Sequence, residues 1–352
     1  MEKRHPLFIA FAAAAVAVPI ISSCSKSVDP LTPENRTATL EVKLQDLKTS
    51  NHAVFATKAS GSKHGDNDAD KAKNTLQLYV FNENKQLENY RCLTGDDITD
   101  GTKLTFEVVE GAKSVWAVAN SHSVSEFAGI KTVDALGALT AKLNKENAGD
   151  FTMVGKNSVE AAVSATPAEV TVDLKRLVAR VHVGTIKTDM SGGYADDSLT
   201  NAKIYLINAY NESQLSTMSG KEGCMVNKKE FKASDTVGFV MKDIVCTDIP
   251  NIKKVAQDID QYFYAYGNSG SEGKTKLVIE GKLGEKTYYY PIRITDKNGA
   301  DLLSANTALN ITDITITRPG SEDPDVDVEY GTVKFIVNVV DWVKRDSSNV
   351  IF

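Results

Sequence analysis

Apolar and polar residues alternate with a period of two through most of the chain. This period indicates half-buried β-strands, because successive side chains of a strand point to opposite faces. Turn-forming stretches such as GDD, DGT and GNSGSEG separate the alternating segments, which is typical of sandwich or barrel domains. The segments are NTLQLYVF, TKLTFEVVE, SVWAVAN, KIYLINA, TVGFVM, QYFYAYG, KLVIEG, KTYYYPIRIT and LNITDITIT. The pattern therefore predicts an all-β protein.

One stretch departs from the strand period. TVDALGALTAKLNK places Val133, Leu136, Leu139 and Leu143 at helical spacing. We therefore expect one short helix, which would connect two strands of the first domain.

A second departure lies in AEVTVDLKRLVARVHV. Its apolar residues occupy even positions up to Leu174 and odd positions from Leu177 onward. A slip by one residue turns the other face of a strand inward, so it marks a bulge or the end of one strand. We place a domain boundary there, which predicts one β-sandwich over residues 37–175 and a second over residues 176–330.

The last alternating segment, within residues 331–352, is apolar on both faces. One face carries Val333, Phe335, Val337 and Val339, and the other carries Lys334, Ile336, Asn338 and Val340. Such a strand needs cover on two sides. It either pairs within its own sheet or serves to pair with another chain.

Residues 1–24 have the composition of an export signal. Two basic residues precede a short apolar run, which is too short to span a bilayer comfortably. The run closes on ISSC, which resembles a bacterial lipoprotein signal with Cys24 as the lipid-modified residue. The polar residues 25–36 then read as a tether. More than one attached acyl chain makes such anchoring stable.

Charge and cysteine content limit the possible binding partners and disulfide bonds. The formal net charge of −6 argues against nucleic acid as a partner, because phosphate backbones attract concentrated basic surfaces. Cys92, Cys224 and Cys246 follow the signal, and an odd number leaves at least one without a partner in the chain. A bridge between Cys224 and Cys246 stays open as an alternative.

The search for catalytic or binding motifs is largely negative. In GNSGSEGKT, Gly267 and Gly273 are separated by five residues, whereas a phosphate loop requires four, so the segment reads as a hairpin connection. DNDAD lacks the glycine and glutamate of a calcium loop and reads as an exposed acidic loop. HExxH and GxSxG are absent from the sequence. We expect no metal, no cofactor and no enzymatic activity.

Several blocks of the sequence resemble the fimbrillins, the subunits of Bacteroidales-type (type V) pili. They are the signal ending at Cys24, LQLYVFN, VWAVAN, VDLKRLVARVHV and LNITDITITRPGSEDPDVDVEYGTVKFIVNVVDW. Together they extend over nearly the whole chain. The resemblance implies two transthyretin-like Greek-key β-sandwich domains, export as an outer-membrane lipoprotein, and incorporation into a cell-surface fimbrium that mediates adhesion.

The resemblance also implies maturation by a surface trypsin-like protease. Cleavage would release a first strand over residues 37–44, with Leu40, Val42 and Leu44 on one face. Since the sequence has no arginine between Arg36 and Arg91, we expect cleavage after Lys58, with Lys63 as the runner-up.

Loss of the first strand would open a groove for a neighbouring subunit. The donor would be residues 331–352, carried out of its own domain by the stiff RPGSEDPDVDVE linker. The donor residues are Val333, Phe335, Val337, Val339 and Trp342. The implied partners are other copies, other fimbrial subunits (anchor and tip), the protease, the outer membrane through the lipid, and host or bacterial surface ligands.

Two other classes of function remain open. A monomeric outer-membrane surface lipoprotein that binds glycans or host proteins would keep Cys24 and its first strand. Its ligand face would involve tyrosines such as Tyr288, Tyr289 and Tyr290, although tyrosines in strands commonly just pack a sheet surface. A surface hydrolase would use a carboxylate pair that the sequence does not identify.

Overall fold

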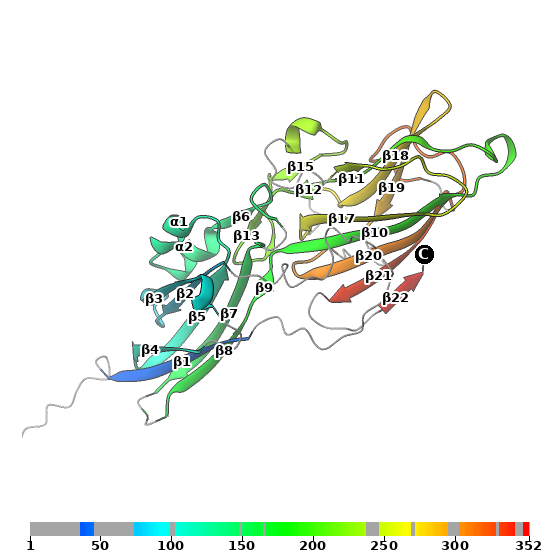
Figure 1. Cartoon of the computed structure of the whole chain (residues 1–352). Coiled ribbons are helices and arrows are strands. Elements are labelled where there is room, and N and C mark those ends of the chain that lie inside the picture. Colours follow the sequence, from blue (N-terminus) through cyan, green and yellow to red (C-terminus); the bar gives the residue numbers. More distant parts are fainter. Residues whose placement is uncertain are drawn as a thin grey trace, which may run out of the picture.

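The computed structural model describes residues 36–45, 74–98, 103–147, 150–162, 164, 166–236, 246–268, 272–294, 303–328, 331–341 and 348–351. Strands dominate these residues, and the two α-helices among them are short. The prediction of an all-β protein is confirmed. Figure 1 shows an elongated molecule with sheets grouped toward its two ends.

Residues 36–176, here called the N-terminal half, form two sheets that pack face to face. The smaller sheet has the strand order β4-β1-β8, and the larger has the order β3-β2-β5-β7-β9. Their strands are β1 (Thr37–Gln45), β2 (Thr75–Phe81), β3 (Leu87–Thr94), β4 (Lys103–Val109), β5 (Gly111–Ala119), β7 (Met153–Ala161), β8 (Ala168–Asp173) and β9 (Lys175–Arg176).

The larger sheet has a hydrophobic cluster on each face, as the apolar residues of β2 show. Leu76, Leu78 and Val80 pack toward the smaller sheet, in a cluster that includes residues of β1, β4 and β8. Tyr79 and Phe81 point the other way, into the main core. The hydroxyl of Tyr79 donates to the carbonyl oxygen of Phe127 at 2.9 Å. The sheet is thus covered on both sides, which explains why β2 is almost entirely buried.

The predicted short helix is present and begins at Val133, but it ends before Leu139 and Leu143, and a second short helix precedes it. The structure has α1 (Val124–Ala128) and α2 (Val133–Ala138), and the chain then enters strand β6 (Thr140–Lys142). Thr132 caps α2 by accepting from the N–H of Ala135. The helix ends early because residues 140–142 pair with β13 (Glu212–Gln214), a partner that local spacing does not reveal. Among the described residues, no helix is long and apolar enough to cross a membrane.

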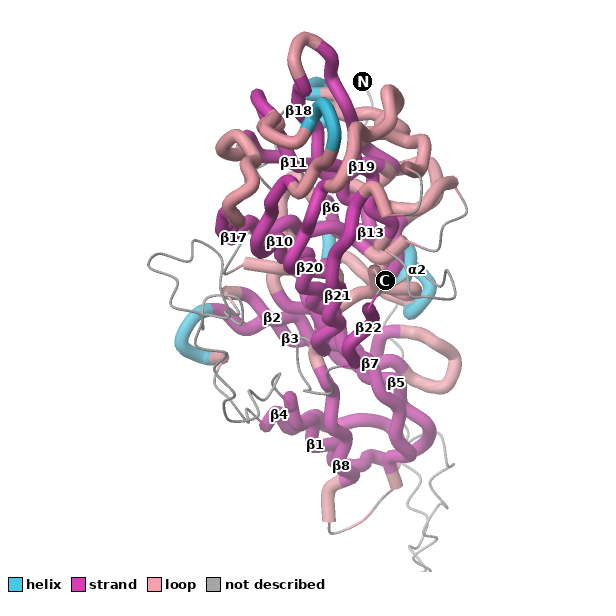
Figure 2. The backbone as a smooth tube through the Cα atoms, turned by 90° about the vertical axis from the view of Figure 1, so that its right-hand side faces the viewer, coloured by secondary structure: helices cyan, strands magenta, loops and turns pink. Residues whose placement is uncertain are grey.

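Residues 178–351, the C-terminal half, also form two packed sheets. One has the order β16-β11-β18-β19 and the other has β17-β10-β20-β21-β22. The strands are β10 (Val178–Thr188), β11 (Thr200–Ile207), β16 (Cys246–Asp248), β17 (Gln257–Tyr266), β18 (Lys276–Leu283), β19 (Lys286–Arg293), β20 (Thr307–Ile316), β21 (Val333–Asp341) and β22 (Ser348–Ile351). In Figure 2, β1, β4 and β8 lie at one end of the tube and β11, β18 and β19 toward the other.

Short elements complete the two halves. The N-terminal half contains the 3-10 turn Gly95–Asp97. The C-terminal half contains β12 (Ala209–Tyr210), β14 (Ser219–Gly220), β15 (Met225–Val226) and the 3-10 turns Gly192–Tyr194 and Ala233–Thr236. β12 pairs with β15, whereas β13 pairs with both β14 and β6. The β14-β13-β6 sheet therefore contains strands of both halves.

The predicted phase slip lies where the chain passes between the halves. β8 ends at Asp173, the two-residue β9 pairs with β7, and β10 begins at Val178. Arg176 is buried at this passage, and its guanidinium donates to the side-chain oxygen of Asn306 at 3.4 Å. This arrangement supports a domain boundary near residues 175 and 176, which we retain as a proposal.

Candidate functional site

The first strand occupies the centre of the smaller sheet. In TATLEVKLQ, the alternation places Ala38, Leu40, Val42 and Leu44 on one face, and their exposed fractions are 3%, 0%, 0% and 6%. These side chains pack into the cluster beneath the larger sheet. β1 therefore contributes apolar side chains to this cluster and is also the middle strand of the smaller sheet that covers it.

Both edges of β1 are paired. Leu40 lies opposite Phe106 in an antiparallel ladder with β4, and opposite Ala168 in a parallel ladder with β8. Val42 is similarly placed between Leu104 and Val170. Removal of β1 would leave two facing strand edges with unpaired backbone groups, separated by the width of one strand. This space, bounded by β4, β8 and the cluster below, is here called the β1 slot.

The outer face of β1 carries charges rather than apolar groups. Lys43 forms an ion pair with Glu169 of β8, and Glu41 lies 3.0 Å from the ammonium of Lys103 on β4. The hydrogen bond to Glu169 raises the pKa of Lys43, and the same bond lowers the pKa of Glu169. Since Glu169 and Lys103 are exposed and lie at the surface, the pairs contribute little to stability. The buried face of β1 holds the strand in the slot.

The predicted donor strand lies in the C-terminal half. β21 pairs with β20 on one side and with β22 on the other, so in this structure it belongs to its own sheet. Val333 and Phe335 are partly buried against the main core. In the ladder with β20, Val337 lies opposite Ile311 and Val339 opposite Leu309.

Several predicted site residues fall outside the described residues. They are Cys24, Lys58, Lys63, Trp342 and the side chains of Val337 and Val339. Cys92 and Cys224 are free thiols, so the alternative bridge from Cys224 to Cys246 is not formed here.

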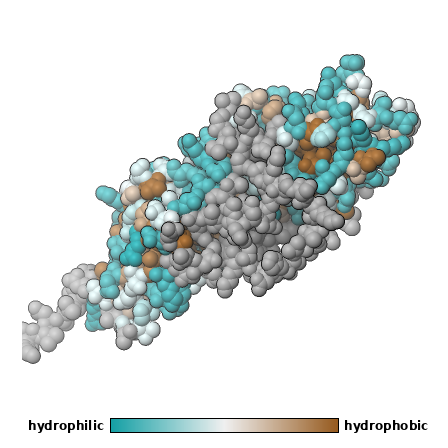
Figure 3. All heavy atoms as spheres, in the orientation of Figure 1, coloured by the Kyte–Doolittle hydropathy of each residue, from teal (hydrophilic) through white to brown (hydrophobic). Residues whose placement is uncertain are grey.

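The three consecutive tyrosines do not all lie on one face of β19. Tyr290 is fully buried in the main core, and Tyr288 packs partly against the same core. Tyr289 lies on the opposite face of β19, near a small cluster with Tyr205 and Phe231. On the face seen in Figure 3, hydrophobic atoms of the described residues form small groups between hydrophilic side chains. The tyrosine run thus provides no continuous aromatic platform.

A buried polar cluster between the halves was not predicted. The carboxylate of Glu146 is fully buried and accepts from the hydroxyl of Tyr266 at 2.9 Å and from the N–H of Thr152 at 2.8 Å. Burial, followed by the nearby Glu146 charge, raises the pKa of Tyr266 well above its usual value. Glu146 comes from the loop after β6, where no sequence pattern marks a buried acid.

His122 lies beside this cluster. Its Nε2 is 3.9 Å from Glu146, and its Nδ1 is 3.3 Å from Asp150. Burial by itself lowers the pKa of His122, but the two carboxylates outweigh burial and raise it. The carboxylates therefore favour the protonated imidazole.

Comparison with known proteins supports a single family. Residues 38–206 match the family model described as major fimbrial subunit protein (FimA). No curated protein sequence matches the chain significantly. The match covers β1, the β1 slot and the passage into the C-terminal half.

Solved structures share the fold over nearly the whole chain. A fimbrilin (FimA) from Porphyromonas gingivalis W83 superposes with a TM-score of 0.60 at 16% identity, covering 88% of this chain and 98% of that one. A putative cell adhesion protein from Parabacteroides distasonis ATCC 8503 gives 0.62 at 14% identity, covering 90% and 100%. The tip fimbrial protein Mfa3 from Porphyromonas gingivalis gives 0.51 at 13%, covering 87% and 100%.

The resemblance stated from the sequence is thereby confirmed. The family consists of structural fimbrial subunits and is not an enzyme family, and its place is the cell-surface fimbrium. Over residues 38–206, this chain resembles the Bacteroidales fimbrillin family.

Proposed function

We propose that this chain is a fimbrial subunit that polymerises by protease-triggered donor-strand exchange. In this proposal it is exported as an outer-membrane lipoprotein acylated at Cys24. A surface trypsin-like protease then cuts after Lys58, or after Lys63, and releases β1. The emptied β1 slot accepts β21 of a neighbouring copy or of another fimbrial subunit, and the resulting fimbrium mediates surface adhesion.

The observation that carries the proposal is the match between β1 and β21. Each strand has nine residues. β1 presents four apolar side chains to the slot at every second position, and β21 carries Val333, Phe335, Val337 and Val339 with the same spacing. A strand of this length and period suits a slot one strand wide, because main-chain bonds form the ladder while alternate side chains fill the pockets.

Once β1 has gone, its empty slot favours the entry of another apolar strand. Burying one Val or Phe side chain stabilises by roughly 1.5 to 3 kcal/mol, so four of them in the slot contribute about 6 to 12 kcal/mol, less the partial burial that Val333 and Phe335 give up in their own domain. β21 leaves two neighbours, β20 and β22, and would gain two others, β4 and β8. Since ladder bonds are exchanged for ladder bonds, their net effect is small. The release of β1, and not a gain in backbone hydrogen bonds, would then trigger strand exchange.

The positions of donor and slot favour a filament. The β1 slot and β21 belong to different halves of the molecule, as Figure 1 shows. A contact between two different surfaces is head-to-tail, and such a contact extends into an open chain unless its rotation closes a ring.

The first test is the mass of the intact chain recovered from the cell surface. A chain that starts at Ala59 or His64 would have lost β1, as proposed. A chain that starts at acylated Cys24 and still contains β1 would be a lipoprotein that does not mature by this route.

The second test addresses the donor face. Wild-type subunits are expected to form high-mass ladders on unboiled denaturing gels, and the double variant Val337→Asp/Val339→Asp is expected to form none. Lys334→Asp adds a single acidic residue to the exposed face of the same strand and should leave the ladders intact. Intact ladders in the double variant would refute the donor assignment.

A further inference from the structure

The segment that precedes β21 is bound along the β18-β19 hairpin. Residues 319–328, here called the acidic linker, form a two-stranded bridge with β19. The N–H of Tyr289 donates to the carbonyl oxygen of Ser321 at 2.8 Å, and the N–H of Ser321 donates back at 2.9 Å. A Cβ at Gly320 would clash with the carbonyl oxygen of Tyr289, so this approach requires glycine.

Three cations of the hairpin pair with the acidic linker. Lys276, whose side chain is only 8% exposed, lies 2.9 Å from a carboxylate oxygen of Asp325 and 3.2 Å from one of Asp327. Its ammonium also donates to the carbonyl oxygen of Asp325. Two exposed pairs flank it, Arg293 with Asp327 and Lys286 with Glu322. These contacts, together with the Tyr289–Ser321 bridge, are here called the linker clamp.

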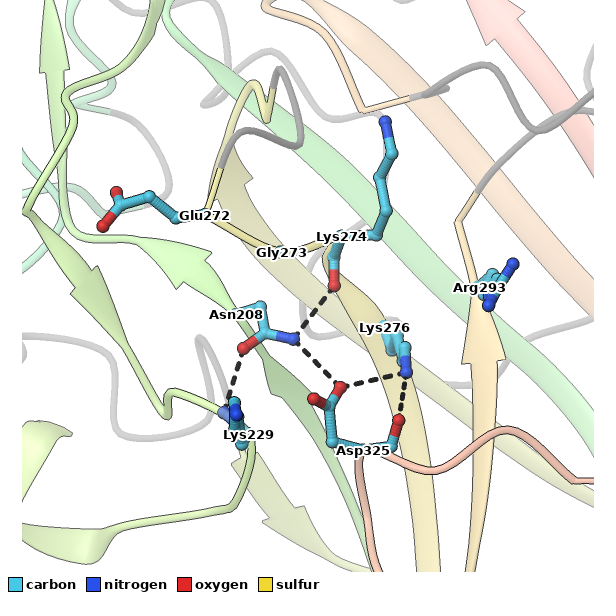
Figure 4. Close-up of a pocket in the computed structure, with 8 residues that line it drawn as sticks. All are labelled: Asn208, Lys229, Glu272, Gly273, Lys274, Lys276, Arg293 and Asp325. Atoms are coloured by element: carbon cyan, nitrogen blue, oxygen red, sulfur yellow. Dashed lines mark hydrogen bonds and ion pairs between the residues drawn. The ribbon is translucent and has the colours of Figure 1, made fainter.

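Asn208 adds a neutral contact to the clamp. Its amide nitrogen donates to Asp325 at 3.3 Å and to the carbonyl oxygen of Lys274 at 3.1 Å, while its oxygen accepts from the N–H of Lys229 at 2.9 Å. Figure 4 shows Asp325 between Asn208 and Lys276. These residues line a pocket of about 260 Å³. Because carboxylates of the linker already neutralise Lys276, we assign this pocket to the linker and not to an external anion.

Gly331 and Thr332, which follow the acidic linker, are held by weaker contacts than the linker clamp. Gly331 adopts a left-handed backbone with φ of 81°, and Thr332 is held by Thr317, whose N–H donates to the carbonyl oxygen of Thr332 at 2.9 Å. The hydroxyl of Thr317 also donates to the carbonyl oxygens of Gly331 and Thr332, so these contacts are neutral hydrogen bonds. A chain that changes direction here would break a few neutral bonds, whereas a chain that left at residue 319 would lose the whole clamp, including the largely buried Lys276 pair.

We propose that the acidic linker stays on the β18-β19 hairpin when β21 leaves, so that the pivot of strand exchange lies at Gly331 and Thr332. This inference rests on the proposed function. It replaces the expectation that the linker carries the donor out of its own domain. The segment delivered to the neighbour begins at about Thr332, and the linker remains a fixed part of the donating subunit, which limits how far apart successive subunits can lie.

Two disulfide locks test the pivot in the full chain with Cys92, Cys224 and Cys246 changed to Ser. The linker lock is Tyr289→Cys/Ser321→Cys, and the strand lock is Asn310→Cys/Asn338→Cys. Both join directly opposite residues of antiparallel pairs, whose Cα separation suits a disulfide. Each variant is oxidised, treated with a trypsin-like protease and examined for ladders before and after reduction.

The expected result is that the linker lock forms ladders as the unlocked chain does, whereas the strand lock forms them only after reduction. If both locks block the ladders until reduction, the linker must leave and the pivot is wrong, while donor-strand exchange stands. If the strand lock forms ladders without reduction, β21 is not the donor, and the proposed function fails together with the pivot.

Amide hydrogen exchange gives an independent measurement without substitutions. The N–H groups of Tyr289 and Ser321 should be as protected in the polymer as in the uncut subunit, within about twofold. A loss of protection of about tenfold or more at these two amides in the polymer would overturn the fixed linker.

Discussion

Tyr266 of β17 donates a hydrogen bond to the carboxylate of Glu146, with 2.9 Å between the oxygens and 120 positions between the residues. The bond joins the two halves at a fully buried point. A buried carboxylate that loses a donor is costly, typically by about 1 to 3 kcal/mol. The halves are thus held together by a specific polar contact as well as by the apolar core.

The first prediction concerns this contact. Tyr266→Phe removes only the hydroxyl and should lower the free energy of unfolding by about 1 to 3 kcal/mol, measured by urea unfolding. Tyr194→Phe, at a 40% exposed tyrosine, is the matched control and should change it by less than about 0.5 kcal/mol. Equal effects would mean that the Glu146 contact does not stabilise the fold.

The second prediction concerns two histidines with opposite pKa shifts. The pKa of His122 is raised above 6.5, so its stabilisation is complete below pH 6.5 and is lost as pH rises through its folded pKa. Burial lowers the pKa of His182 despite its contact with Asp260, so its contribution is present above pH 6.5 and is lost as pH falls through its folded pKa.

NMR titration of the two imidazole rings measures these shifts, with His122→Gln and His182→Gln for assignment. The resonance of His122 should titrate above pH 6.5 and that of His182 below it. If both titrated at the same pH, the Glu146 and Asp150 carboxylates would not act on His122 as described.

The third prediction concerns β1 before maturation. Leu40→Ala creates a cavity beneath the larger sheet and should destabilise the uncut chain by about 2 to 5 kcal/mol, measured by chemical unfolding. Thr39→Ala, on the outer face of the same strand, should cost less than about 0.5 kcal/mol. Fimbriae built from matured subunits should be equally stable in both variants, because the altered strand has been released.

A difference between those fimbriae that matched the precursor difference would show that β1 remains in the polymer. The comparison therefore separates a structural role of Leu40 in the precursor from a role in the assembled fimbrium.

The fourth prediction concerns the cleaved bond. Lys58→Ala/Lys63→Ala should keep β1 on the surface-recovered chain and abolish the ladders, whereas Lys71→Ala should mature normally. Intact mass and unboiled gels report both outcomes. Normal maturation of the double variant would move the cleavage to another basic residue.

Much of the fold could be predicted from the sequence because its strands are long and alternate strictly. TLQLYVF and GAKSVWAVA became β2 and β5, and TATLEVKLQ became β1 with the predicted face buried. The two- and three-residue strands β12 to β15 could not be predicted, since so few residues carry no period. Helix α2 ended early because the pairing of β6 with β13 overrode helical spacing.

Some residues of the candidate site could likewise be predicted from the sequence, whereas others could not. The buried face of β1 follows from local alternation, so Leu40, Val42 and Leu44 could be identified. The linker clamp could not, because Asp325 and Asp327 look like solvated acids until Lys276, 49 positions from Asp325, is brought against them. Glu146 was missed for the same reason, since its partners lie on distant strands.

The parallel ladder between β1 and β8 also bears on how the chain folds. Lys43 and Glu169, which form an ion pair across it, are 126 positions apart. Contacts of such long sequence separation form slowly, because a large loop must close before any bond rewards it. We expect β1 to enter its place late, after β4 and β8 have formed against the larger sheet. The last strand to join the native sheet, β1, would then also be the strand that the folded domain can most easily lose. The final folding step of the precursor would thus be left open for a strand of another subunit to complete.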